Sequence, residues 1–236
     1  MKLQILILFI TVLISGCAII PQTTDIPLIR EKGDLRIDAG VSLIPTANAT
    51  VSYGLSEKIA VQAYGSYGAD HPYFIQGAVG LFKNKGNNIV TEWYTGVGTG
   101  NAEVTDSSDP GKLKGNYQLY FTQFNIGKLN SNFLRADYGL GLKAAYARSK
   151  FTDKDYFDIY SYKSTDFLYP IQNDNGFVLQ PTVFGRFGKG RLKFNVKAGG
   201  LLYYQFTNRE NKLPVGYFNL GLGLNYYINT KPFKRK

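Results

Sequence analysis

From about residue 34 onward, apolar and polar residues alternate with a period of two, and clusters of turn-forming residues separate the alternating segments. This period places successive side chains on opposite faces of a β-strand. In segment 133–149, every second residue from Leu134 to Tyr146 is apolar, whereas the residues between them are charged or small. We therefore predict ten strands, at 34–44, 48–55, 59–68, 73–83, 88–104, 115–127, 133–149, 176–187, 191–207 and 218–228.

The connections between these segments differ in length. Four are tight turns, whereas 105–114 and 151–175 are long. Short connections favour antiparallel neighbours. The expected fold class is thus all-β: a closed, up-and-down antiparallel barrel over residues 34–229, with about ten strands and eight also compatible. Pro181 interrupts segment 176–187 and cannot donate a ladder hydrogen bond, so it predicts a bulge or a strand end there.

The polar face of the alternation carries charged residues, which indicates a closed barrel with these side chains pairing across its lumen. Strand closure also leaves no unpaired backbone edge. The predicted lumen network comprises Arg36, Asp38, Glu92, Arg135, Asp137, Lys143, Lys193 and Lys197.

Periodicity alone leaves open whether the apolar face meets lipid or packs inward as in a water-soluble barrel. The segments reach the nine to eleven residues that cross a bilayer at a tilt, and aromatic residues such as Tyr203 and Tyr226 lie near segment ends, which favours the membrane arrangement. The composition agrees with a strand-rich protein, because Tyr (18), Phe (16) and Gly (26) are abundant.

The first 17 residues have a different pattern, without the alternation of the later segments. Lys2 precedes an apolar run from Leu3 to Ile14, which is too short for a membrane-spanning helix and is typical of a signal peptide. Ser15-Gly16-Cys17 follows and holds the single cysteine of the chain. This sequence resembles the lipobox of bacterial lipoproteins, which implies removal of residues 1–16 and acylation (palmitate) of Cys17. We then expect a flexible tether at 17–33 and a basic tail at 230–236.

The stretch from 34 to 229 resembles the small outer-membrane β-barrels of eight or ten strands. The resemblance implies an outer-membrane location with the long connections outside and both chain termini in the periplasm. The tail from Thr230 to Lys236 departs from the aromatic residue that usually ends those chains.

Little in the sequence indicates catalysis, a cofactor or a metal. Some barrels of this type are enzymes with a rim histidine, and His71, near Ser66, is the one candidate, but a polar loop residue explains it better. The run from Gly96 to Gly100 lacks the helix and lysine of a phosphate loop. The acidic cluster at 153–158 does not have EF-hand spacing. We therefore expect no enzyme, no cofactor and no metal site.

The net charge of +10 calls for anionic partners. Nucleic acid does not suit an exported lipoprotein, whereas the phosphates of outer-membrane lipid head groups would lie at both rims of a barrel. The aromatic-rich connection 151–175 is the candidate for binding an envelope protein or ligand. Our first hypothesis is a non-catalytic structural or binding barrel. The alternatives are a periplasmic lipocalin-like carrier of a small apolar ligand, a rim-histidine lipid-modifying enzyme and, least favoured, a channel.

Overall fold

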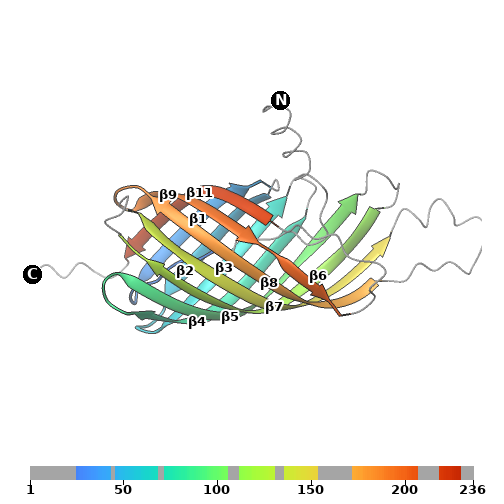
Figure 1. Ribbon diagram of the computed structural model, residues 1–236, viewed down its shortest axis with the longest axis horizontal. Coiled ribbons are helices and arrows are strands. Elements are labelled where there is room, and N and C mark those ends of the chain that lie inside the picture. Colours follow the sequence, from blue (N-terminus) through green and yellow to red (C-terminus); the bar gives the residue numbers. More distant parts are fainter. Residues whose placement is uncertain are drawn as a thin grey trace, which may run out of the picture.

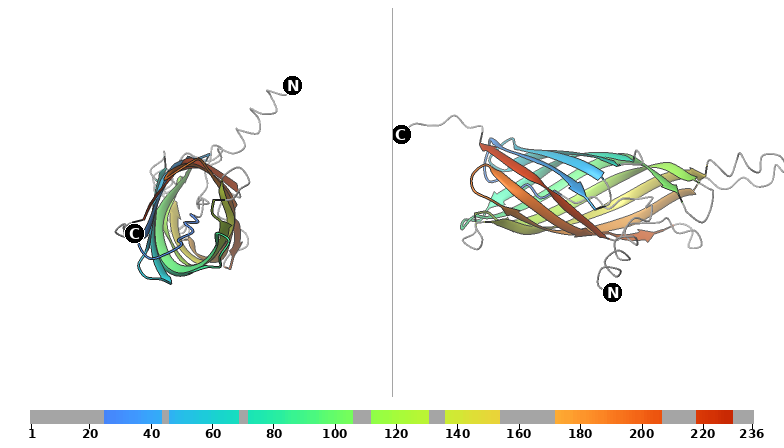
Figure 2. Two further views of the ribbon diagram at one scale, coloured as in Figure 1. Left: turned by 90° about the vertical axis from the view of Figure 1, so that its left-hand side faces the viewer. Right: turned by 90° about the horizontal axis from the view of Figure 1, so that it is seen from above.

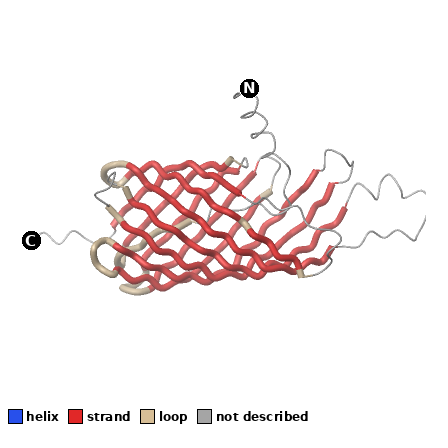
Figure 3. Tube along the Cα trace, in the orientation of Figure 1, coloured by secondary structure: helices blue, strands red, loops and turns tan. Residues whose placement is uncertain are grey.

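The described part of the computed structural model consists of strands joined by loops (Figure 3). It describes residues 25–43, 46–68, 72–105, 112–130, 136–153, 172–206 and 218–229. The strands are β1 (Asp34–Ser42), β2 (Thr46–Gly54), β3 (Ile59–Gly68), β4 (Tyr73–Asn84), β5 (Ile89–Thr105), β6 (Lys112–Lys128), β7 (Asp137–Asp153), β8 (Gln172–Phe187), β9 (Leu192–Gly200), β10 (Leu202–Gln205) and β11 (Phe218–Asn229).

The sheet closes on itself, which confirms the predicted fold class. Consecutive strands from β1 to β8 pair in sequence order, β1 pairs with β11, and β9 pairs with both β11 and β8. β10 continues the line of β9 along β8, so the two segments act as one barrel strand. The described chain therefore forms a ten-strand barrel rather than one of eight.

The proline in β8 interrupts a ladder, but not its own strand. Pro181 pairs with Leu142 on one side, whereas on the other side pairing stops between Thr182↔Gly199 and Leu179↔Leu202. The register is the same on both sides of this gap, so there is no bulge. Because Pro181 has no N–H to donate, the break falls in the neighbouring strand, at Leu201.

One end of the barrel carries the short turns, and at the other end the strands stop at different heights. β1 begins and β11 ends at the short-turn end, where Asp34 pairs with Asn229. β5 to β8 extend far beyond the other strands at the opposite end (Figure 1). Strand pairing reaches Thr105↔Lys112 and Phe151↔Gln172, so the connections expected at 105–114 and 151–175 are shorter than predicted.

The apolar face of the alternation points outward. Charged residues on the alternate positions point into the barrel and are buried, as with Asp38 and Lys143 at 1% exposure. This orientation of the two faces is the reverse of that in a water-soluble barrel, which has an apolar interior. No helix in the described ranges is long and apolar enough to cross a membrane. The outward side chains include Ile37, Val41, Val51, Ile75, Val79, Leu81, Trp93, Val97, Leu140, Leu142, Val183, Leu222 and Leu224.

Glycines allow close strand contact where β1 meets β11. Gly40 pairs with Gly223, and a Cβ added at Gly40 would lie 2.5 Å from the carbonyl oxygen of Leu222. Since that neighbour is backbone and cannot rotate away, we expect Gly40→Ala to lower the free energy of unfolding by about 1–3 kcal/mol. Gly77→Ala is the matched control, because its Cβ would meet nothing within 4 Å. Thermal unfolding in detergent should separate the two variants, and equal midpoints would contradict this reading.

Candidate functional site: a segment of the chain inside the barrel

The residues before β1 lie inside the ring of strands. Figure 2 shows this blue segment within the barrel when the molecule is viewed along its axis. Asp25 is 2% exposed, and Ile26, Leu28 and Ile29 are fully buried. We call residues 25–31 the lumen segment. The flexible tether expected at 17–33 thus differs from the structure over its described part, because these residues have buried partners on the barrel wall.

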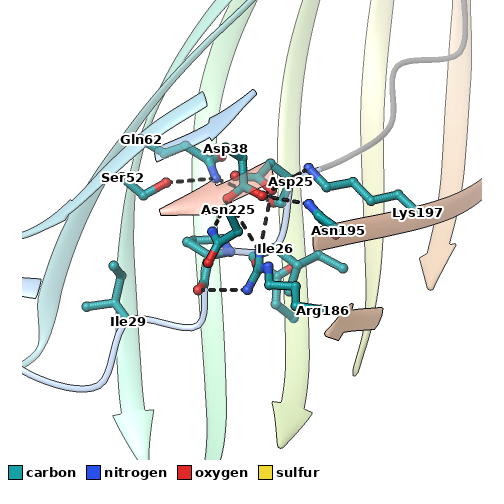
Figure 4. A network of polar contacts seen from close by, with 12 residues as sticks. Asp25, Ile26, Ile29, Asp38, Ser52, Gln62, Arg186, Asn195, Lys197 and Asn225 are labelled. Atoms are coloured by element: carbon teal, nitrogen blue, oxygen red, sulfur yellow. Dashed lines mark hydrogen bonds and ion pairs between the residues drawn. The ribbon is translucent and has the colours of Figure 1, made fainter. Parts of the chain in front are cut away.

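The carboxylate of Asp25 lies among cations from two strands (Figure 4). Lys197 on β9 donates to its Oδ1 at 2.7 Å, and the Arg186 guanidinium on β8 lies 3.7 Å from the same oxygen. Both cations also approach Asp38 on β1, at 3.8 and 3.5 Å respectively. Two buried carboxylates and two buried cations therefore compensate one another.

Asp38 is held in place by amides from the barrel wall. Asn195 donates to its Oδ1 at 2.6 Å, and Asn225 donates to its Oδ2 at 2.7 Å. Each carboxylate oxygen of Asp38 thus accepts a hydrogen bond from a neighbouring strand, β9 or β11, independently of the lumen segment.

The wall also recognises the backbone of the lumen segment. Gln123 donates to the carbonyl of Asp25 at 2.9 Å, and Gln62 lies at 3.4 Å from the same oxygen. Arg186 donates to the carbonyls of Ile26 and Pro27 at 2.6 and 3.3 Å. Side chains from β3, β6 and β8 thus hold three successive carbonyl groups of the lumen segment.

A carboxylate on β5 accepts a backbone N–H of the lumen segment. The Ile29 N–H donates to Glu92 Oε1 at 2.7 Å, and Asn125 donates to Glu92 Oε2 at 2.9 Å. Glu92 is 1% exposed, so this bond forms where water does not compete.

The apolar side chains of the lumen segment fill gaps left by glycines. A Cβ on Gly141 would lie 2.8 Å from Ile26 Cδ1, and one on Gly127 would lie 2.5 Å from Leu28 Cδ1. Leu28 has a φ of 56°, a left-handed conformation that its surroundings impose. Each of these buried side chains contributes roughly 1.5–3 kcal/mol of hydrophobic free energy.

At the short-turn end, a polar cluster fixes the point where the lumen segment joins β1. Tyr227 on β11 accepts a hydrogen bond from Arg30 and donates one to Asp34, both at 2.7 Å. The Arg30 and Arg36 guanidinium groups lie 5.0 and 4.8 Å from the centre of the same ring. Asn229 donates to Glu31 at 2.7 Å.

Removing the hydroxyl of Tyr227 should loosen this join without emptying the lumen. Tyr227→Phe retains the ring and its cation contacts but loses two hydrogen bonds of a partly buried group. We expect the free energy of unfolding to fall by about 1–3 kcal/mol. Proteolysis of the folded protein in detergent should cleave the variant faster near residue 30, and a cleavage rate equal to that of the native protein would contradict this role.

Charge balance inside the barrel depends on Asp25. The buried Asp, Glu, Lys and Arg residues of the described chain are five acids and five bases, namely Asp25, Asp34, Asp38, Glu92 and Asp137 with Arg36, Lys143, Arg186, Lys193 and Lys197. Burial alone would raise the pKa of Asp25, but Lys197 and Arg186 outweigh it and hold this pKa below its ordinary value. Asp25 is thus an anion at neutral pH.

Of the predicted lumen network, the structure places all seven described members inside the barrel. Asp38 and Lys197 belong to the Asp25 cluster, Lys193 contacts Asp137 at 2.7 Å, and Lys143 contacts Gln76 at 2.8 Å. Asp25 and Arg186 were missed. Arg186 shares the parity of the inward residues Gln180 and Thr182 in its strand, so alternation could have revealed it.

Several predicted features lie outside the described residues. These are Cys17, His71, Arg135, residues 154–171 of the candidate recognition loop, and the tail at 230–236. Within the described ranges, no group of three metal-ligating side chains comes together. Gly96 to Gly100 lie in β5, in a ladder with β4 and β6.

The similarity of this chain to known proteins lies in structure and not in sequence. No family model matches the chain, and no curated protein matches it. Among solved structures, the chain is similar to a KdgM porin with a TM-score of 0.36 and 11% sequence identity, over 82% of this chain and 98% of that one. The architecture described above defines the class: a closed ten-strand antiparallel barrel with a polar interior and an apolar exterior.

Proposed function

We propose that this chain is a bacterial outer-membrane β-barrel with a structural or binding role and no catalytic step, closed by its own lumen segment. The observation that carries this proposal is the direction of the side chains. A continuous outward surface of Leu, Ile and Val suits hydrocarbon, and the charges inside have buried partners.

Exposed aromatic residues support the same location. Tyr138, Phe187 and Tyr226 lie near the short-turn end of their strands, whereas Tyr67 and Tyr73 lie at the opposite end. Two such groups match the aromatic girdles that membrane barrels carry at their two interfaces. In this arrangement the short turns, the start of β1 and the end of β11 face the periplasm, and the lipid on Cys17 adds an anchor to the outer membrane.

The contents of the lumen argue against the other hypotheses. A lipocalin-like carrier needs an apolar interior with room for its ligand, whereas here charges and the lumen segment occupy the interior. A permanently open channel would need a free passage where the lumen segment lies. The rim-histidine enzyme rests on His71, which lies outside the described residues.

The test replaces Cys17 with serine behind a cleavable secretory signal. We expect the protein still to fractionate with outer membranes and to resist extraction by carbonate, since the barrel itself would hold it in the bilayer. Recovery of a folded, soluble protein from the periplasm would overturn the membrane assignment.

A further inference from the structure

We propose that the wall of the lumen is a binding site for a short acidic, apolar peptide, which the chain's own segment Asp25–Ile29 occupies. The inference deepens the proposed binding role. It concerns the interior of the barrel, so it can be tested in detergent whatever the location of the protein in the cell.

The contacts to the lumen segment are those of peptide recognition. Arg186 and Lys197 bind the Asp25 carboxylate, while Gln123 and Arg186 hold successive backbone carbonyls. Glu92 accepts the N–H of Ile29. Because carbonyl and N–H groups belong to every peptide, these contacts recognise a peptide backbone, and the cations select an acidic residue at its N-terminal end.

The apolar pockets supply the rest of the specificity. Ile26 packs over Gly141, Leu28 packs over Gly127, and Ile29 is buried in a cluster with Phe82 and Tyr94. Side chains on those glycines would fill the space that the ligand needs. A ligand of this class therefore has an acidic residue followed by branched aliphatic residues.

The present fit is incomplete, which leaves room for a competing ligand. Among the described residues, Oδ2 of Asp25, Nε of Arg186 and Oε1 of Gln62 and Gln123 are buried without a hydrogen-bond partner. A buried polar group left unpaired costs about 1–3 kcal/mol. A peptide from another envelope protein that satisfies the wall atoms among these, on Arg186, Gln62 and Gln123, would compete with the chain's own segment.

The experiment uses the full chain with Asp25→Lys, which places a third cation against Arg186 and Lys197 and should weaken the hold on the lumen segment. The probe is the hexapeptide Asp-Ile-Pro-Leu-Ile-Arg, acetylated at its N-terminal end and carrying a fluorophore at its C-terminal end, and its binding is followed by fluorescence anisotropy in detergent. We expect saturable binding at least tenfold tighter than to the native protein. Combining Asp25→Lys with Arg186→Met and Lys197→Met should abolish it, as should asparagine at the first peptide position.

Two results would overturn the proposal. One is a folded Asp25→Lys protein that does not bind the peptide, and the other is binding that neither the wall substitutions nor the asparagine peptide reduce. Should Asp25→Lys not fold, Asp25→Asn combined with Leu28→Ser takes its place, with the same expectations and the same contrary results. A failure here leaves the carbonate test of location unaffected, so the two proposals fail separately.

Discussion

Replacing Asp25 with asparagine should lower the free energy of unfolding by about 3–5 kcal/mol at neutral pH. The substitution keeps the shape of the side chain but removes a negative charge buried against Lys197 and Arg186. Breaking one side of a buried ion pair leaves the partner charge uncompensated, which is more costly than losing the pair as a whole. Urea unfolding of the purified barrel measures the difference.

The effect should depend on pH in a defined direction. The folded-state pKa of Asp25 is lowered from its unfolded value of about 3.9. Its stabilisation is therefore complete above that value and is lost as the pH falls through the folded pKa. The native protein and the asparagine variant should converge in acid. A difference that grows below pH 4 would contradict the ion-pair explanation.

A double-mutant cycle provides the control. If Asp25 and Lys197 interact directly, Asp25→Asn combined with Lys197→Met should cost less than the two single substitutions added together. Lys58→Gln, at an exposed turn position, should change the stability by less than about 0.5 kcal/mol. Strict additivity in the cycle would show that the destabilisation comes from elsewhere.

Arginine at position 222, in the middle of the outward surface, should destabilise the barrel in a bilayer by about 2–4 kcal/mol. Leu222 lies within β11 and is 52% exposed, pairing with Val41 and Val196. Because its side chain points away from the lumen, the cost of Leu222→Arg comes from placing a charge in hydrocarbon. Folding equilibria into lipid vesicles measure it.

The matched control is Leu55→Arg, since Leu55 is 48% exposed but lies in the turn after β2, at the edge of the barrel. A charge near an interface costs about 0–1 kcal/mol. If both arginines cost the same small amount, the outward surface faces water and the membrane assignment is wrong.

The sequence predicts the fold well because a period of two is a direct consequence of strand geometry. In β1, the residues Arg36 and Asp38 face inward and Ile37 faces outward, as alternation requires. The effect of Pro181 could not be predicted in the same way. The missing N–H was expected to disturb the strand that contains it, but the ladder is lost on only one side, and the neighbour is interrupted instead. Which side is lost depends on strand pairing, which the local sequence does not specify.

The lumen segment could not be predicted from periodicity. Asp25 to Ile29 are too few to show a period, and Pro27 favours an irregular path. A hint nevertheless exists in the charges. The predicted lumen network holds five cations (Arg36, Arg135, Lys143, Lys193 and Lys197) against three carboxylates (Asp38, Glu92 and Asp137). This excess of cations on the predicted inward face calls for further anions, and Asp25, from outside the strands, provides one of them.

The most direct test of the account is a disulfide between the lumen segment and the barrel wall. A Cβ on Gly141 would lie 3.0 Å from Ile26 Cγ1, about the separation of a Cβ and the opposite sulfur in a disulfide. Oxidising Ile26→Cys combined with Gly141→Cys in native membranes should consume both thiols within one chain, as maleimide labelling reports, while either single variant keeps its thiol. Two thiols that stay free in the double variant under oxidation would contradict the placement of this segment inside the barrel.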